Sequence, residues 1–293
     1  MHVVRGEGVW LFDAQGRRYL DCYNNVPVVG HCHPRVTEAV VRQTRLLNTH
    51  SRYLYEPLVE LAERLVATMP PGTGLDAVML VNSGSEANDL AWRLATTATG
   101  HRGAIVTGFA YHGVTTAIAD FSPEEWPQGF KPEHVETITP GGPFSEPASG
   151  LAATYLDCGF TSDGILTPSA EEVQAIARAT RDAGGLDVAD EVQAGHGRSG
   201  EHLWSFAQYG LAPDVVTLGK PMGNGYPVAA VIARQELFDR LKEETEVFST
   251  FGGNPVAARA ALAVLDVIED ERLVEHVELL GGALAATVDG SVK

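Results

Sequence analysis

The sequence predicts an α/β fold with a mostly parallel central sheet. Short apolar runs alternate along the chain with segments whose apolar residues recur at helical spacing, as in sheets covered by helices. Of the 293 residues, 44% are hydrophobic and 20% are charged, which is typical of a folded protein and not of a disordered one. A chain of this length buries a large core and can fill one large domain or two smaller ones.

The apolar runs predict about six strands, each with boundaries uncertain by roughly 2–4 residues. They are 77–81, 104–106, 151–156, 185–190, 214–219 and 228–232. The helical pattern occurs at 34–47, at 87–95, from Ser169 onward and after Pro255. Ser169 and Glu172 predict a capping box, whereas Gly281 and Gly282 interrupt the last helical pattern. Residues 122–150, rich in Pro, Gly and Ser, predict a long surface excursion.

Charge and cysteine content narrow the possible partners and compartment. Lys and Arg total 21 against 38 Asp and Glu, a formal net charge of −17 that repels nucleic acid and anionic lipid. The cysteines, Cys22, Cys32 and Cys158, are odd in number and lack CxxC spacing, which favours a reducing compartment. The N-terminus lacks the apolar stretch of a signal peptide, and no run reaches the ~18 apolar residues of a membrane span. We therefore expect a soluble, cytoplasmic protein.

Two predicted strands end in side chains of complementary chemistry. One ends in Asp190 and Glu191, and the next ends in Lys220, flanked by glycine and proline. Pyridoxal phosphate requires such a pair, because a carboxylate keeps its pyridine nitrogen protonated and a lysine holds its aldehyde as a Schiff base. Alone, the acids indicate a solvated strand end and the lysine a surface charge. Together they favour the cofactor, with Asp190 preferred over Glu191 and with Gln193 placed to bond the ring hydroxyl.

Small residues predict two phosphate contacts. Ser83, Gly84 and Ser85 join a strand to a helix, where N–H groups and hydroxyls can reach a phosphate at the positive helix end. The alternative is plain capping, since Ser83 and Glu86 also match a capping box. Thr250 stands in a glycine-rich stretch before another helix, and its hydroxyl could reach a phosphate in the same subunit or across an interface. An ordinary turn is the alternative there.

Tyr111 and His112 follow a predicted strand and turn. An aromatic ring there can stack on a heteroaromatic ligand, a contact worth about 1 kcal/mol, although a tyrosine packed on the surface explains it equally well. His112 is the second candidate to stack or to donate a hydrogen bond. The sequence His31-Cys32-His33 has no second ligand pair at zinc-site spacing, so a packed turn is expected and no metal.

A glycine motif offers a competing interpretation. Residues 195–200 match GxGxxG, and Asp214 follows at the spacing of a ribose-binding acid, as in a dinucleotide-dependent dehydrogenase. Such a site needs its glycines directly at the strand–helix turn, and here 190–194 intervene. The dehydrogenase interpretation is therefore the weaker one.

The order of these motifs resembles the class III aminotransferases of the fold-type-I pyridoxal-phosphate superfamily. Within them the chain is similar to the branch of ethanolamine-phosphate and phosphohydroxylysine phospho-lyases. The matching segments are 21–26, 29–34, 51–54, 82–88, 189–193, 217–220 and 250–255. The resemblance implies that residues 1–50 form the N-terminal part of a small domain and that 51–256 form the cofactor-binding large domain. It implies that 257–293 form a linking helix and the start of a truncated, incomplete C-terminal small domain.

The resemblance also implies roles for the site residues. Lys220 would form the Schiff base, and Asp190 would bind the pyridine nitrogen. Gln193 would meet the ring hydroxyl, and Tyr111 would stack on the ring. Phosphate contacts would come from Gly84 and Ser85 of one subunit and from Thr250 of the other, because family members are homodimers with shared sites.

The chain departs from the family pattern in several places. It is shorter than family members, whose C-terminal domain carries an arginine that grips a substrate carboxylate. Asp187 takes an apolar strand position, which is costly if it is buried and unpaired. The Glu-Pro that many relatives carry after the strand ending at Leu156 is absent.

We therefore expect a transaminase that uses a small amine or amino acid and a keto-acid acceptor. The same residues would serve a phospho-lyase acting on O-phosphoethanolamine-like substrates. A truncated, non-catalytic remnant is the remaining alternative.

Overall fold

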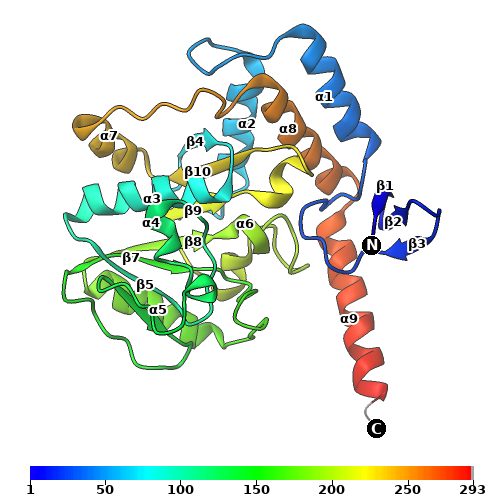
Figure 1. The fold of residues 1–293 in the computed structure, drawn as a ribbon. Coiled ribbons are helices and arrows are strands. Elements are labelled where there is room, and N and C mark those ends of the chain that lie inside the picture. Colours follow the sequence, from blue (N-terminus) through cyan, green and yellow to red (C-terminus); the bar gives the residue numbers. More distant parts are fainter. Residues whose placement is uncertain (292–293) are drawn as a thin grey trace.

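The computed structural model describes residues 1–291 and is built around a seven-stranded sheet (Figure 1). The strand order is β4-β10-β9-β8-β7-β5-β6. In chain order the strands are β4 Ala77–Val81, β5 Gly103–Thr107, β6 Val135–Ile138, β7 Leu151–Leu156, β8 Leu186–Asp190, β9 Val215–Leu218 and β10 Ala229–Ala233. β10 runs antiparallel to β4 and β9, and every other neighbouring pair is parallel. The predicted α/β class with a mostly parallel sheet is confirmed.

β6 corrects the prediction of about six strands. It lies inside 122–150, the segment expected to be a surface excursion, and pairs with β5 at the sheet edge. Val135 and Ile138 are buried, but the two residues between them are polar, so the strand is too short to show a period in the sequence.

Helices cover both faces of this sheet. On one face, α3 (Gly84–Thr99) and α7 (Gln235–Glu244) pack over side chains such as Val231. On the other, α2 (Glu56–Ala67), α5 (Ala170–Asp182) and α8 (Pro255–Asp270) pack over its neighbour Ile232. Consecutive strand residues thus enter different apolar clusters, which explains why the strands are continuously apolar in sequence. Ser169 and Glu172 form the predicted capping box of α5.

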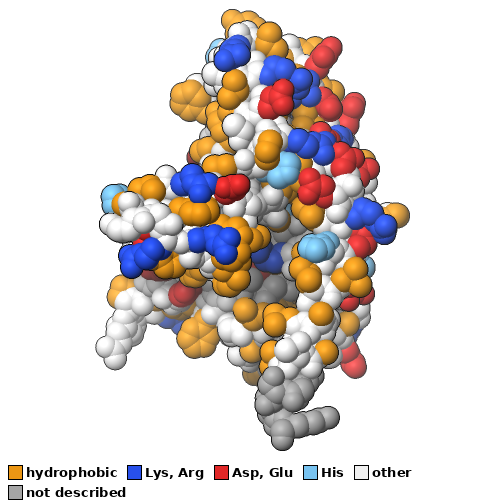
Figure 2. Space-filling view, turned by 90° about the vertical axis from the view of Figure 1, so that its right-hand side faces the viewer, with side chains coloured by type: hydrophobic (Ala, Val, Ile, Leu, Met, Phe, Trp, Pro, Cys, Tyr) orange, Lys and Arg blue, Asp and Glu red, His pale blue; other side chains and the backbone are white. Residues whose placement is uncertain are grey.

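The remaining elements flank this body. A small antiparallel sheet precedes it, with strands β1 Val3–Glu7, β2 Trp10–Asp13 and β3 Arg18–Leu20. Next, α1 (Pro34–Leu46) packs on α8, and α9 (Leu273–Ser291) leaves the body at the C-terminal end (Figure 1). Basic and acidic side chains are interspersed over the face of the molecule shown in Figure 2. Arg35 of α1 pairs with Asp270 of α8 at 2.7 Å. No helix within residues 1–291 has the length and apolarity required to span a bilayer.

The glycine pair in the last helix also corrects a prediction. Gly281 and Gly282 were expected to interrupt the helical pattern, yet α9 continues through both. Glycine lowers helix stability by about 1 kcal/mol relative to alanine, but it keeps its backbone N–H and does not break the hydrogen-bond ladder.

Candidate active site

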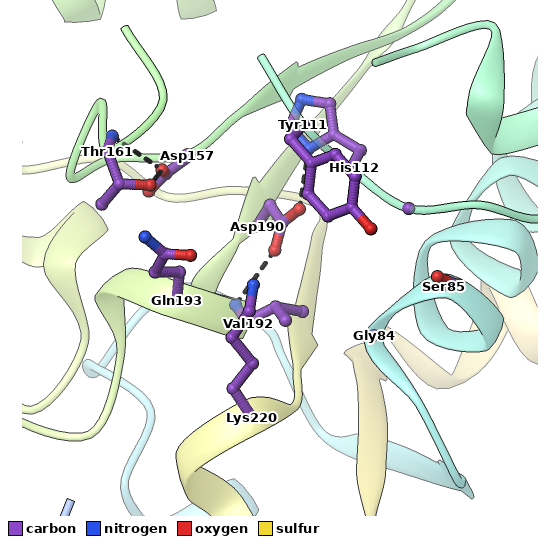
Figure 3. A pocket seen from close by; sticks show the side chains of 11 residues that line it. Gly84, Ser85, Tyr111, His112, Asp157, Thr161, Asp190, Val192, Gln193 and Lys220 are labelled. Carbon is purple, nitrogen blue, oxygen red and sulfur yellow. Dashed lines mark hydrogen bonds and ion pairs between the residues drawn. The ribbon is translucent and has the colours of Figure 1, made fainter. Parts of the chain in front are cut away.

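A pocket with about 520 Å³ of empty volume opens beside the carboxyl end of β8 (Figure 3). Most of the predicted site residues line it, namely Gly84, Ser85, Tyr111, His112, Asp190, Gln193 and Lys220. Segments more than a hundred residues apart in sequence therefore meet in one place, at the strand ends where α/β proteins bind ligands.

Asp190 is the most deeply buried carboxylate of this pocket, at 4% exposure. Its Oδ2 accepts hydrogen bonds from His112 Nδ1 at 2.7 Å and from Asn88 Nδ2 at 2.8 Å, and its Oδ1 accepts one from the Val192 N–H at 3.0 Å. Burial by itself raises the pKa of Asp190, but the His112 hydrogen bond and charge, with the Val192 and Asn88 donors, outweigh burial. The pKa therefore lies below its ordinary value, and the carboxylate stays ionised.

Asn88 and Thr217 complete this network, and sequence reasoning missed both. Asn88 Nδ2 also donates to the His112 carbonyl at 2.8 Å, and Asn88 Oδ1 accepts from Thr217 Oγ1 at 2.8 Å. Asn88 is 1% exposed and Thr217 is 0% exposed, so these bonds are shielded from water. Asn88 belongs to the motif 82–88, but its position one helical turn beyond the expected phosphate site gave no sign of a contact with Asp190.

Lys220 extends its amine into the pocket toward Asp190 (Figure 3). The Nζ atom lies 5.9 Å from the centroid of the Tyr111 ring, so amine and ring border the same space. Lys220 begins η3 (Lys220–Gly223), a short 3-10 turn, and its own φ is +25°, an uncommon conformation for a residue with a side chain. Lys220, Tyr111 and Asp190 thus surround one cavity, as the sequence predicted.

The N-terminus of α3 forms another wall. Ser83 is its N-cap, where the side chain accepts from the Glu86 N–H at 3.2 Å, and Ser83 does not line the pocket. The predicted capping box is only half formed, because the Glu86 carboxylate accepts from the Asn82 N–H at 3.0 Å instead. Gly84 does line the pocket, and a Cβ there would lie 2.6 Å from Val192 Cγ1, so this position requires glycine.

Asp157 and Thr161 line the pocket without having been predicted as site residues. Asp157 accepts hydrogen bonds from the Gly159 and Thr161 N–H groups at 2.9 Å each and from the Thr161 hydroxyl. Burial raises the pKa of Asp157 and the charge of Asp190 adds to this, against the hydrogen bonds from Thr161. The sequence did not identify Asp157 as a site residue, because an acid that follows a strand does not by itself reveal that it faces a cavity.

Two predicted candidates lie elsewhere. Thr250 is exposed in the turn before α8 and does not line the pocket formed by this single chain. Glu191 is fully buried and accepts from Ser205 N at 2.8 Å, Ser205 Oγ at 2.7 Å and Phe206 N at 2.8 Å. Burial raises the pKa of Glu191 to about 7 despite these bonds. Glu191 thus anchors a neighbouring turn, and Asp190 is the carboxylate that faces the pocket.

The glycine motif at 195–200 follows the short helix α6 (Glu191–Ala194) and not a strand. Two of its glycines lie against α9, since a Cβ on Gly197 would be 2.8 Å from Val274 Cγ2 and one on Gly200 would be 2.7 Å from Glu278 N. Asp214 pairs with Arg234 at 2.7 Å. The motif therefore serves close packing, and its placement does not support a dinucleotide site.

Asp187 and the turn 31–33 lie outside the pocket. Asp187 is buried but paired, with Arg181 Nη1 at 2.8 Å from its carboxylate. His31 Nε2 lies 2.7 Å from Asp21 Oδ2, which fits the packed turn that was expected. Within residues 1–291, no group of three His, Cys, Asp or Glu side chains is placed to hold a metal ion.

Comparison with known proteins gives consistent matches. The profile of the family described as "Aminotransferase class-III" matches residues 1–140 and 151–289. Ethanolamine-phosphate phospho-lyase homolog 1 of Caenorhabditis elegans is 37% identical over 96% of this chain and 68% of that protein. Alanine–glyoxylate aminotransferase 2-like of Drosophila melanogaster is 38% identical over 97% of this chain and 64% of that protein. The chain thus spans about two thirds of the length of these curated relatives.

Solved structures agree with the sequence comparisons. A phospholyase from Arthrobacter in complex with phosphoethanolamine has a TM-score of 0.93 and 37% identity, covering 99% of this chain and 74% of that one. The ornithine aminotransferase of Toxoplasma gondii, with partial occupancy of PLP at its active site, has a TM-score of 0.83 and 26% identity, covering 96% and 70%. The predicted fold type and the predicted resemblance are confirmed. The chain belongs to the class III aminotransferase family of fold-type-I proteins, whose cofactor is pyridoxal phosphate.

Proposed function

We propose that this chain is a pyridoxal-phosphate-dependent transaminase that uses a small amine or amino acid and a keto-acid acceptor. The observation that carries the proposal is the convergence of Lys220, Asp190 and the N-terminus of α3 on one pocket. These groups match the aldehyde, the ring nitrogen and the phosphate of the cofactor.

The chemistry of the pocket residues fits the cofactor. Asp190 is an ionised carboxylate with a lowered pKa, as a partner of a protonated ring nitrogen must be. Gly84 and Ser85 stand at the positive end of a 16-residue helix, which favours a bound phosphate. Tyr111 borders the space beside Lys220 and would cover a ring face, and Gln193 would bond the ring hydroxyl.

Each residue then has a definable task. When bound, the cofactor supplies an electron sink for the substrate carbon next to the amine. Lys220 would hold the cofactor through Nζ, release it to the incoming amine, and carry a proton from the substrate carbon on that same Nζ. Asp190 would keep the ring nitrogen protonated, and His112 and Asn88 would hold its carboxylate in place.

A homodimer is part of the proposal. Thr250 is exposed and would complete the phosphate site of a partner subunit. Its neighbours Phe251 and Phe248 are exposed by 70% and 43%, and Tyr53 by 63%, so the surface around Thr250 is apolar enough to pack against a second copy. We expect the chain to elute as a dimer in size-exclusion chromatography with light scattering, and a purely monomeric chain would remove Thr250 from the site.

A phospho-lyase reaction is the second candidate. It is favoured by the 37% identity to the Arthrobacter phospholyase whose structure contains phosphoethanolamine. The same Lys220 amine would remove the proton, and loss of a β-phosphate would replace reprotonation at the cofactor.

One screen separates these reactions. The purified chain is loaded with pyridoxal phosphate, and phosphoethanolamine, ornithine and β-alanine are added separately. The visible absorbance of the bound cofactor, released phosphate and new amino acid from added keto acids are then measured. Amino-group transfer without phosphate release supports the transaminase, and phosphate release supports the lyase. Cofactor binding without turnover of any amine would contradict both and leave the non-catalytic remnant.

A further inference from the structure

The N-terminal segment 25–30 is bonded to the turn that carries Lys220. Asn224 ends that turn, and its Oδ1 accepts from the Val29 N–H at 3.1 Å while its Nδ2 donates to the Gly30 carbonyl at 2.9 Å. The Asn224 amide therefore satisfies both a backbone donor and a backbone acceptor of a segment almost two hundred residues away. Such a pair of bonds fixes position as well as distance.

The same segment is bonded to a second wall of the pocket, the turn of Gln193. Arg198 Nε donates to the Gln193 carbonyl at 3.0 Å, and Arg198 Nη2 donates to the Asn25 carbonyl at 2.9 Å. Gln193 lines the pocket, so one guanidinium links a pocket wall to segment 25–30. Arg198 comes from the glycine-rich run 195–200, two of whose glycines pack against α9.

Segment 25–30 also contacts parts of the chain outside the pocket. Val28 and Val29 pack against the apolar cluster of α1 and α8, and His31 exchanges backbone hydrogen bonds with Gly8 at 3.1 and 2.7 Å. Gly30 has a φ of +93°, and a Cβ there would lie 3.1 Å from Gly8 Cα, so glycine permits this close approach. In Figure 1 the segment belongs to the dark-blue loop between β3 and α1.

The Lys220 turn needs such support. A φ of +25° at a lysine is a strained backbone conformation, which persists only where the surroundings determine it. Inside the turn, the Met222 N–H bonds to the Gly219 carbonyl at 2.8 Å and the Asn224 N–H bonds to the Pro221 carbonyl at 3.0 Å. The Asn224 side chain then connects the turn to segment 25–30.

We propose that residues 25–30 form a strap that fixes the Lys220 turn relative to the Gln193 turn. Asn224 and Arg198 are the positioning residues of this strap, and they set how firmly the pocket retains its cofactor. The retention part rests on the proposed function, whereas the mechanical link between the two turns exists in the cofactor-free chain.

Four variants test the strap. Asn224 has a φ of +49°, where glycine is unstrained, so Asn224→Gly removes both side-chain bonds without forcing the backbone. Asn224→Asp keeps the acceptor for Val29 and loses the donor to Gly30. Arg198→Ala removes the other link, and Arg198→Lys keeps the charge but cannot reach two carbonyls in a fork. Arg240→Ala on α7 and Asn48→Ala after α1, both at exposed positions, are the matched controls.

Amide hydrogen exchange on the cofactor-free chain is the first measurement. Arg198→Ala is expected to raise exchange at Met222 and Asn224 about tenfold, although the Arg198 guanidinium bonds to the Gln193 and Asn25 carbonyls and not to that turn. One or two lost hydrogen bonds give an effect of this order. Asn224→Gly is expected to raise exchange at the Gly195 N–H, which bonds to the Glu191 carbonyl at 3.1 Å in the Gln193 turn. The Asn224 side chain bonds to Val29 and Gly30 and not to the Gln193 turn, so a role confined to the Lys220 turn does not predict this effect.

The rate at which pyridoxal phosphate leaves the loaded chain is the second measurement. We expect an increase of about tenfold in Asn224→Gly and Arg198→Ala, smaller increases in the two conservative variants, and none in the controls. Exchange at Gly195 in Asn224→Gly, and at Met222 and Asn224 in Arg198→Ala, that stays within twofold of the controls would overturn the strap. Raised exchange with unchanged cofactor release would overturn its role in retention. A wild-type chain that binds no pyridoxal phosphate would contradict the proposed function and the retention role together, and exchange alone would then decide on the strap.

Discussion

Asp187 and Asp190 lie on the same strand, β8, and both are almost fully buried, at 8% and 4% exposure. Their carboxyl groups nevertheless have pKa values shifted in opposite directions. Burial, with the nearby charge of Asp214, raises the pKa of Asp187 to about 7 against its pairing with Arg181. The pKa of Asp190 is lowered, because hydrogen bonds from His112, Val192 and Asn88 outweigh an equal or greater burial.

The difference shows that depth alone does not decide whether a buried acid stays charged; the hydrogen bond and charge of His112, together with the Val192 and Asn88 donors, lower the pKa of Asp190. Asp190 accepts hydrogen bonds on both oxygens, whereas Asp187 Oδ1 has no hydrogen-bond partner among the described residues. Asp190 can thus pair with a cation as an ionised carboxylate, whereas the environment of Asp187 favours its protonated form.

The largest expected effect separates the two acids by function. Asp190→Asn removes the charge that would hold the ring nitrogen protonated, and we expect kcat/KM of the loaded enzyme to fall by about a thousandfold. Asp187→Asn should leave kcat/KM within about twofold, since Asp187 does not line the pocket. Amine turnover measured with saturating pyridoxal phosphate checks both, and an Asp190→Asn variant that keeps a tenth of the activity would contradict the role of Asp190.

The next effect distinguishes Asp187 from Asp190 by the pH dependence of the unfolding free energy. The raised pKa means that folded Asp187 holds a proton below about pH 7, where the unfolded chain has lost it, so stability increases as the pH falls from 7 toward 4. Asp187→Asn imitates the protonated acid and should stabilise the chain by about 3 kcal/mol at pH 8, with a smaller gain at pH 5. Urea unfolding at the two pH values measures this. An equal effect at both pH values would show that Asp187 has an ordinary pKa.

A third change would make Asp190 resemble Asp187. His112→Phe removes the foremost contribution that lowers the pKa of Asp190, so that pKa should rise. A carboxyl group whose pKa is lower in the folded chain than in the unfolded chain stabilises the fold at pH values above its unfolded pKa. This stabilisation is lost as the pH falls through the folded pKa. Because the folded pKa of Asp190 is higher in the variant, the variant loses the stabilisation at a higher pH. Acid unfolding of the cofactor-free chain, followed by circular dichroism, should shift to higher pH. A midpoint identical to wild type would assign the low pKa to other donors.

The smallest effect concerns the outer part of the same network. Thr217→Val keeps the shape of the side chain but leaves Asn88 Oδ1 without its donor, and we expect a loss of about 1 kcal/mol in unfolding free energy. Thr37→Val, at an exposed position on α1, is the control. No difference between the two variants would mean that the Thr217 hydroxyl does not support the Asp190 network.

Much of the pocket was predictable because its residues stand in motifs at strand ends. Asp190 ends a readable strand, Lys220, Gln193 and Gly84 each stand shortly after one, and parallel strands bring their carboxyl ends together. Asn88 and Thr217 were not predictable, since their partners lie far away in sequence and neither residue type indicates a site by itself. Asp157 also follows a strand, but an acid in that position does not by itself indicate a cavity.

The errors in the fold have similar physical origins. β6 has four residues, of which the inner two are polar, so it shows no clear alternation and depends on pairing with β5. The N-terminal strands are exposed on most of their surface and have few buried side chains to produce a pattern. In both cases the strand is determined by its partner and not by its own residues.

Reductive trapping with borohydride tests the central claim most directly. The chain is incubated with pyridoxal phosphate, reduced, digested and analysed by mass spectrometry. The account predicts one modified peptide, carrying the reduced cofactor on Lys220, and no such peptide when Lys220→Ala is treated in the same way. Modification spread over surface lysines, or an unmodified Lys220 in a folded chain, would contradict it.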